Sequence, residues 1–195
     1  MLEYLIVGGF FMWPIFALMV LSLGIILEKI YQLYLIQNSI NNDYKTELKD
    51  AIYAKDISKI KSFCLKNRNS ISKSLLKAIE VSDKEDLDLA YENIMQNKLN
   101  ELTRGEFLLG IAISICPQLG LLGTVTGMIS AFTGLSNESN EAMVAAGISE
   151  ALFTTAYGLS VAVFALFFHI LFNKRIDYIN NEIYFYLSLF KKVCK

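Results

Sequence analysis

Three long runs without a charged residue constrain this 195-residue chain more than any other feature of its sequence. They extend over residues 5–27, 107–137 and 151–173 and contain 23, 31 and 23 residues. The hydrocarbon core of a bilayer is about 30 Å thick, and a helix crosses it with roughly 20 apolar residues. Each run is long enough to cross, so the sequence predicts an all-α integral membrane protein with three transmembrane helices.

The positive charges predict how these helices are oriented. All 18 Lys and Arg residues lie at Lys29, between Lys45 and Arg104, or from residue 174 onward. Three crossings place all of them on one side of the membrane, and positive charges mark the cytoplasmic side of a span. We therefore expect a multi-pass protein of the bacterial inner membrane, with a periplasmic N-terminus and a cytoplasmic C-terminus.

The three runs divide the chain into seven segments. We predict transmembrane helices over residues 10–36, 105–135 and 142–173. The other four are a short outer N-terminal segment, a cytoplasmic helical loop, a periplasmic link and a cytoplasmic C-terminal amphipathic helix, over residues 1–9, 37–104, 136–141 and 174–195. Apolar residues recur every three or four positions in the last segment, as in an amphipathic helix: Ile176, Ile179, Ile183, Leu187 and Phe190.

The loop over residues 37–104 has the composition of helical sequence. It contains no glycine or proline, and Asn67–Ser70 is its best candidate for a break. We therefore expect two or three helices in the loop. Nothing between residues 83 and 104 ends a helix, so we expect this stretch to continue into the second span. The spans are then the membrane parts of longer helices that project into the cytoplasm.

Small residues recur at helical spacing in the second and third spans. Glycines four positions apart let a second backbone approach closely, which is how helices pack in a membrane. We therefore expect the two spans to form an antiparallel hairpin. The residues assigned to this packing are Gly120, Gly123, Gly127, Gly147 and Gly158.

Glu150 is the most informative polar residue. It lies about nine residues inside the third span, or roughly 13 Å at 1.5 Å per residue, where a lone acid costs about 2.5–3.5 kcal/mol on the insertion scale. Hydroxyls at mid-membrane depth come from Thr124, Thr154 and Thr155. One interpretation is a polar path for protons along these residues. The alternative is local bonding, with Glu150 on a neighbouring threonine and each hydroxyl on its own helix.

Two sequence runs resemble a known family. Residues 116–129 read CPQLGLLGTVTGMI, which resembles the APLLGLLGTVxGM signature of the ExbB/TolQ proton-channel family. Residues 147–163 read GISEALFTTAYGLSVAV, which is similar to its GIAEALxxTAxGLxVAI pattern, and the first span resembles its MxPI and ER motifs. The resemblance covers all three spans in order. Cys116 and Gln118 depart from the family's Ala and Leu without removing a motif residue.

The resemblance implies an assembly. Members form a homo-oligomeric ring, a pentamer in the best-known cases, with the second and third spans facing a central pore. Inside the ring lies a single-span partner of the ExbD/TolR type, whose intramembrane aspartate carries the proton. The complex converts the proton-motive force into work on a periplasm-spanning protein of the TonB or TolA type. Carried over to this sequence, Thr124 matches the motif threonine of the second span, Glu150 the acid of the third and Thr155 its pore threonine. We assign these three and Thr154 to the proton path.

We therefore expect a proton-channel subunit of the ExbB type, which powers outer-membrane uptake through a TonB-type protein. Two alternatives stay open: a TolQ-like subunit that serves envelope maintenance and cell division, and a membrane scaffold that conducts nothing. We expect no enzyme, because the spans hold no nucleophile–base pair and the loop has no phosphate-binding glycine motif. A net charge of −1 argues against a nucleic-acid partner, and a single histidine excludes a His-rich metal site, so no metal is expected. No cofactor is expected.

Overall fold

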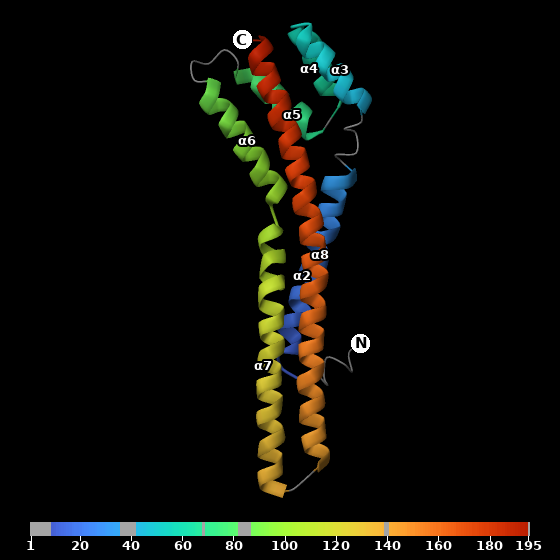
Figure 1. The fold of residues 1–195 in the computed structure, drawn as a ribbon, viewed down its shortest axis with the longest axis vertical. Helices are drawn as coiled ribbons and strands as arrows, with labels where there is room; N and C mark the ends of the chain where they lie inside the picture. Colours follow the sequence, from blue (N-terminus) through green and yellow to red (C-terminus); the bar gives the residue numbers. More distant parts are fainter. Residues whose placement is uncertain (1–8, 36–41, 68, 82–86, 139–140, 195) are drawn as a thin grey trace. The chain divides into compact units, whose positions relative to one another are not determined.

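The computed structural model describes residues 9–35, 42–67, 69–81, 87–138 and 141–194, and the regular elements within them are all helices (Figure 1). The chain divides into two units. Unit 1 takes in residues 1–27 and 105–170, and unit 2 takes in residues 28–104 and 171–195.

Three helices are long and apolar enough to cross a membrane. They are α2 (Met12–Ile30), which continues as a π-helical turn over Tyr31–Leu35, α7 (Glu106–Glu138) and α8 (Glu141–Cys194). The prediction of an all-helical chain with three helices able to span a membrane is therefore confirmed. Only 22–28% of the most apolar stretch of each helix is buried inside the structure. Such large apolar surfaces need a bilayer or other helices to cover them.

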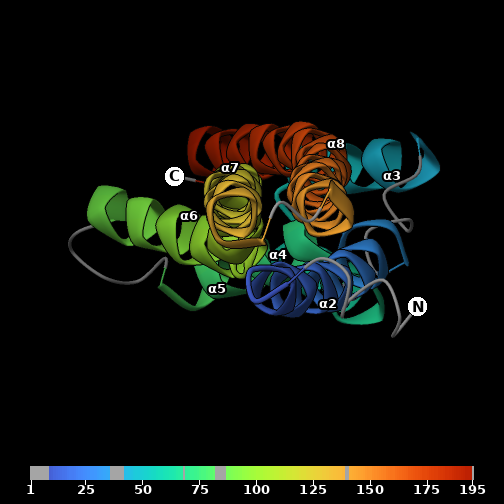
Figure 2. The same ribbon diagram turned by 90° about the horizontal axis from the view of Figure 1, so that it is seen from below.

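In unit 1, α7 and the first part of α8 form an antiparallel pair, and α2 lies beside that pair (Figures 1 and 2). The hydroxyl of Tyr157 on α8 donates a hydrogen bond to the sulfur of Met19 on α2, 3.1 Å away. Pro14 lies in the first turn of α2, where its missing N–H costs little because that group has no partner within the helix. Because the connection between α7 and α8 is short, residues of these two helices that are distant in the sequence lie side by side.

Unit 2 contains the end of α2 with its π-helical turn, four shorter helices and the last part of α8. The four are α3 (Asn42–Tyr53), α4 (Ile57–Lys66), α5 (Ser70–Val81) and α6 (Leu87–Thr103), and consecutive members contact one another. Lys45 on α3 forms an ion pair of 2.6 Å with Glu182 on α8. The apolar stripe predicted for the C-terminal helix is buried in this unit, as expected of an amphipathic helix: Ile176, Ile179, Ile183, Leu187 and Phe190.

The loop between the first two spans contains more helices than predicted. The sequence predicted two or three, and the described residues form four. The predicted break is confirmed, because α4 ends at Lys66 and α5 begins at Ser70. Asn67 closes α4 by donating its backbone N–H to the carbonyl of Phe63. Asp56 opens the same helix by accepting a hydrogen bond from the backbone N–H of Lys59, as N-cap residues do.

The prediction of one uninterrupted helix from the loop into the second span is wrong. Helix α6 ends at Thr103 and α7 begins at Glu106, with a turn between them. Gly105 has φ +88°, in the left-handed region that glycine adopts most readily and that commonly ends a helix. The side-chain amine of Lys29 donates to the carbonyl of Leu102, one of the terminal carbonyls that lack a partner within α6. The glycine directly after Arg104 is the signal that the sequence analysis overlooked.

Candidate functional site

The hairpin of α7 and α8 is built on direct backbone contact between two glycines. A Cβ atom on Gly127 would lie 2.8 Å from the carbonyl oxygen of Gly147, and one on Gly147 would lie 2.9 Å from the carbonyl oxygen of Gly127. Ala151 and Ala131 flank this contact at 2.9 and 3.0 Å from the same positions. No side chain fits there without moving a backbone, so the small residues set how closely the helices approach.

The remaining predicted packing glycines extend this contact along the hairpin. A Cβ atom on Gly158 would lie 2.5 Å from the carbonyl oxygen of Cys116, in the turn that holds Pro117. The added atom on Gly123 would meet the side chain of Thr154 at 2.6 Å. All five glycines assigned from the sequence therefore belong to α7 and α8, and four of them leave no room for a Cβ atom, whereas Gly120 has slightly more room.

Thr155 connects α8 to α7 through a side-chain hydrogen bond. Its hydroxyl donates to the carbonyl of Gly120, 2.7 Å away. The Thr155 backbone lies directly against Gly120 as well, since a Cβ atom on that glycine would be 3.0 Å from the Thr155 Cα. Thr155 is half-buried, so its hydroxyl lies at the edge of the helix contact. A group in that place can bond to the hairpin or to a molecule beside it.

The other two threonines bond to their own helices. Thr124 donates to the carbonyl of Leu121 at 2.6 Å, and Thr154 donates to the backbone carbonyl of Glu150 at 2.8 Å. These are the local bonds that threonine commonly forms in a helix. Thr154 is completely buried, at 0% exposure, against Gly123. Thr124 is half-buried and lies one turn along α7 from Gly120, on the same side of that helix.

Glu150 lies on α8 one turn before Thr154, and its half-buried carboxylate lies against the backbone of Gly9. A Cβ atom on Gly9 would overlap the carboxylate. Gly9 has φ +67°, a conformation that glycine adopts without the strain a side chain would bring. The ion pairs found among the described residues do not include Glu150. The acid is thus held beside the residue that precedes the first span.

The structure brings some predicted site residues together and separates others. Thr155 meets Gly120, and Thr154 meets Gly123. Glu150 and Thr155 are five positions apart, about 7.5 Å along the axis and rotated by about 140°, so they share only a broad face of α8. Gly9 was missed by the sequence analysis, although a pair of glycines directly before an apolar run is a recognisable turn signal.

A second polar feature lies on the same hairpin and was not predicted as a site. Glu106, Ser114 and His169 line an open groove formed by α7 and α8 together with apolar side chains. This groove lies at the end of α7 that follows Gly105, away from the Gly127–Gly147 contact. Among the residues that the structure describes, no three His, Cys, Asp or Glu side chains gather as a metal ion would require.

Residues 56–184 match the model of the MotA/TolQ/ExbB proton channel family. The matched region contains α7, most of α8 and all four predicted polar path residues. It begins at the N-cap of α4 and ends within the buried stripe of α8. The match therefore takes in parts of both units and the whole of the second span.

Three relatives place the match among named proteins. The putative biopolymer transport protein ExbB-like 1 of Synechocystis is 31% identical over 177 residues, which are 85% of this chain and 68% of the relative. The biopolymer transport protein ExbB of Salmonella typhimurium is 40% identical over 75 residues, 37% of this chain and 31% of the relative. The Tol-Pal system protein TolQ of Haemophilus influenzae is 34% identical over 90 residues, 45% of this chain and 40% of the relative. The chain thus spans less than half the length of the last two.

Proposed function

Because the chain belongs to the MotA/TolQ/ExbB proton channel family, we propose that it is a proton-channel subunit of an energy-transducing motor in the bacterial inner membrane. The observation that carries the proposal is the position of Glu150. This acid lies inside one of the three apolar helices that can cross a membrane, and it forms no ion pair among the described residues. An ionisable side chain at such a depth is costly, and membrane proteins retain one mainly where it handles ions or protons.

The proposed orientation places the N-terminus in the periplasm and unit 2 in the cytoplasm. Unit 2 carries all 18 Lys and Arg residues of the sequence, and unit 1 carries none. Positive segments beside a span stay on the cytoplasmic side. In this orientation Glu150 lies toward the periplasmic end of α8, and Thr155 lies deeper. Protons driven inward would then meet the acid before the hydroxyl.

We assign different roles to the predicted polar residues. Glu150, when ionised, accepts a proton from the periplasmic side and passes it to an acceptor beside the hairpin. The hydroxyl of Thr155 is poised at the edge of the α7–α8 contact, where it can exchange its bond to Gly120 for one to that acceptor. Thr124 offers a second hydroxyl on the same side of α7 as Gly120. Thr154 has no exposed surface, so we assign it to helix packing rather than to the path.

The acceptor is proposed to be the aspartate of a single-span partner of the ExbD/TolR type, inside a homo-oligomeric ring. Both helices of the hairpin leave large apolar side chains exposed on their outer faces, such as Val125 and Phe132 on α7 and Leu152 and Val163 on α8. Faces of this kind can be covered by lipid, by a second copy or by a partner helix. We propose a pentamer in which copies of the hairpin surround the partner.

The proposed output is work on a periplasm-spanning protein. We favour the ExbB type, with a TonB-type protein and outer-membrane uptake. The TolQ type, with a TolA-type protein and envelope maintenance, is the second candidate because a TolQ protein is also among the relatives. A membrane scaffold that conducts nothing is a different class and predicts no role for Glu150 beyond packing.

Complementation tests the proposal and separates the two types. The chain is expressed, together with a single-span protein of the ExbD/TolR type, in one host that lacks ExbB and in another that lacks TolQ. We expect recovery of proton-driven uptake in the first host and its loss with Glu150→Ala, at unchanged protein level. Recovery of outer-membrane integrity in the second host alone would instead assign the TolQ type. Full activity of Glu150→Ala would remove the acid from the path.

The partially conservative change Glu150→Gln distinguishes how the acid works. Gln keeps the hydrogen bonds of the protonated form but cannot release a proton. If Glu150 acts only while protonated, Glu150→Gln should keep most of the uptake. If it must ionise, as we propose, Glu150→Gln should be as defective as Glu150→Ala. The same host and uptake assay serve both variants.

A further inference from the structure

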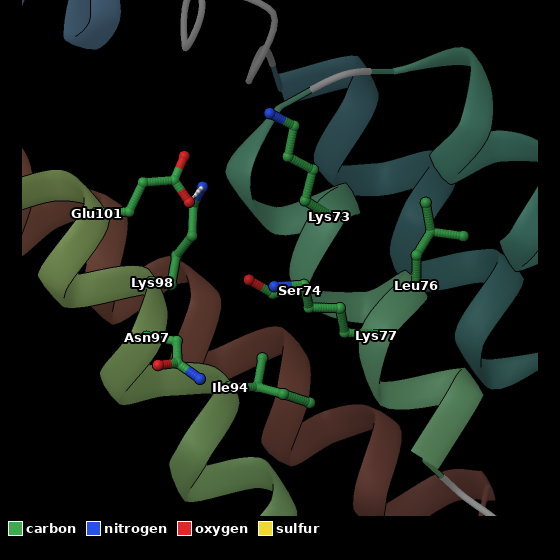
Figure 3. A pocket seen from close by; sticks show the side chains of 8 residues that line it. All are labelled: Lys73, Ser74, Leu76, Lys77, Ile94, Asn97, Lys98 and Glu101. Atoms are coloured by element: carbon green, nitrogen blue, oxygen red, sulfur yellow. Dashed lines mark hydrogen bonds and ion pairs between the residues drawn. The ribbon is translucent and has the colours of Figure 1, made fainter.

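Unit 2 contains a basic cavity between α5 and α6 that has no role in the proposed proton path. Its volume is about 190 Å³, enough for several water molecules or a small polyatomic ion. Figure 3 shows side chains of α5 and α6 facing one another across it. The polar side chains that line the cavity are Lys73, Ser74, Lys77, Asn97, Lys98 and Glu101.

The charges around the cavity do not balance. Among the described residues that line it, three ammonium groups face one carboxylate, that of Glu101, which gives a formal charge of +2. Lys98 is 8% exposed and forms an ion pair of 2.7 Å with Glu101 (Figure 3). Burial lowers the pKa of Lys98, the bond to Glu101 opposes this, and the charges of Lys73 and Lys77 lower the pKa further. Two exposed lysines thus line the same cavity as the buried one.

Ser74 is a second and independent sign of an unfilled site. Ser74 is only 1% exposed, and its hydroxyl has no hydrogen-bond partner in the described part of the chain. A buried hydroxyl without a partner is uncommon, because burial removes its bonds to water without replacing them. The usual partner for a helical serine is the carbonyl one turn back. Ser74 instead lines the cavity, where a bound molecule would supply an acceptor.

We propose that this cavity binds a dianionic phosphate group, as free phosphate or as a phosphate monoester. Lysine is a common phosphate ligand that acts as a compact point charge. A phosphate monoester carries a charge of about −1.5 to −2 near neutral pH and offers three acceptor oxygens. That charge matches the +2 of the cavity, and the oxygens match the donors on Lys73, Lys77 and Ser74. A phosphodiester carries one charge and leaves half of the excess unmatched.

Isothermal titration calorimetry of the whole chain in detergent, at constant ionic strength, measures ligand binding and tests the proposal. The ligands are inorganic phosphate, short-chain phosphatidic acid as a monoester lipid, and short-chain phosphatidylglycerol as a diester lipid. We expect phosphate and phosphatidic acid to bind with dissociation constants in the millimolar range or tighter, and phosphatidylglycerol to bind more weakly. Tighter binding of phosphatidic acid than of phosphate assigns the natural ligand to lipid; equal binding assigns it to soluble phosphate.

Matched double variants separate this site from general charge effects. Lys73→Gln with Lys77→Gln should weaken phosphate binding by about tenfold or more, a loss of about 1.4 kcal/mol. Lys61→Gln with Lys66→Gln removes the same charge from exposed positions on α4, outside the cavity, and should leave binding nearly unchanged. Glu101→Gln removes the competing carboxylate and should strengthen binding, which a purely structural role of Glu101 does not predict.

Ser74→Ala provides a test that does not depend on charge. Without phosphate, this variant should be at least as heat-stable as the unaltered protein, because the lost hydroxyl has no partner. Phosphate should then raise its melting temperature less than it raises that of the unaltered protein. No binding of phosphate or monoester lipid by the unaltered protein overturns the proposal. Equal losses in the two double variants, or binding of an oligoglutamate peptide but not of phosphate, overturn it as well.

Discussion

Thr155→Val is the substitution that separates a proton-handling hydroxyl from a packing hydroxyl. Valine keeps the branched shape of threonine and removes only the oxygen. The lost interaction is the 2.7 Å hydrogen bond to the carbonyl of Gly120. Hydrogen bonds between membrane helices contribute about 0.6 kcal/mol on average and about 1.7 kcal/mol at most. The hairpin should therefore still form, with a destabilisation in that range.

The effect on proton flux should be larger than the effect on stability. A loss of about 0.6 kcal/mol changes an equilibrium by roughly threefold, whereas removal of a group that holds the proton acceptor in the rate-limiting step costs about tenfold or more. We expect Thr155→Val to lower proton flux by at least about tenfold. The assay is proton uptake into liposomes that contain the chain and the proposed single-span partner. Native mass spectrometry of the same sample verifies that the assembly is intact.

Thr154→Val is the matched control, because it makes the same change one residue away on the same helix. Thr154 is completely buried and bonds to the carbonyl of Glu150, so it presents no surface to a pore. Its substitution should leave proton flux near that of the unaltered protein. Equal flux in the two variants, whether both are active or both inactive, would refute the separation of a path hydroxyl from a packing hydroxyl.

Three further predictions follow from the glycines and the buried thiol. Gly127→Leu should destabilise the hairpin by about 1–3 kcal/mol, as overpacking does. Gly110→Leu on the same helix should not, because a Cβ atom there meets nothing within 4 Å. Thermal denaturation in detergent measures the stability of both variants. Gly9→Ala should lower proton flux more than Gly105→Ala: both positions have positive φ, but only the first displaces a carboxylate. Burial raises the pKa of the Cys64 thiol to about 11, so its alkylation, followed by peptide mass spectrometry, should be slow at pH 8 and accelerate until about pH 11 as thiolate forms.

The sequence predicted the spans well because length and absence of charge are sufficient physical criteria for a membrane helix. The buried stripe from Ile176 to Phe190 was equally accessible, since helical periodicity states which side chains share a face. The break at Gly105 was also visible as a glycine, but the long glycine-free loop before it hid that signal. A turn with positive φ depends on a single residue, whereas a span depends on twenty.

The roles of neighbouring identical residues were beyond the sequence. Thr154 and Thr155 differ by 100° around the helix, and both contact α7. Which of them is buried and which lies at the edge of the contact depends on the register of the hairpin. That register is set by contacts such as Gly127 with Gly147, between residues far apart in the chain. The contact of Gly9 with Glu150 also joins residues far apart in the chain, so the sequence could not predict it. The cavity of unit 2 could not be predicted either, because two helices each contribute ordinary surface residues that become a site only together.

Proton flux across a liposome membrane tests the central claim most directly. The chain and the proposed single-span partner are reconstituted together, a membrane potential is imposed, and internal pH is followed with a dye. We expect inward flux from the unaltered complex and from Glu47→Ala, which removes an exposed acid of α3, and little or no flux from Glu150→Ala. Flux that is unchanged in Glu150→Ala, or absent from the unaltered complex, would contradict a proton path through this hairpin.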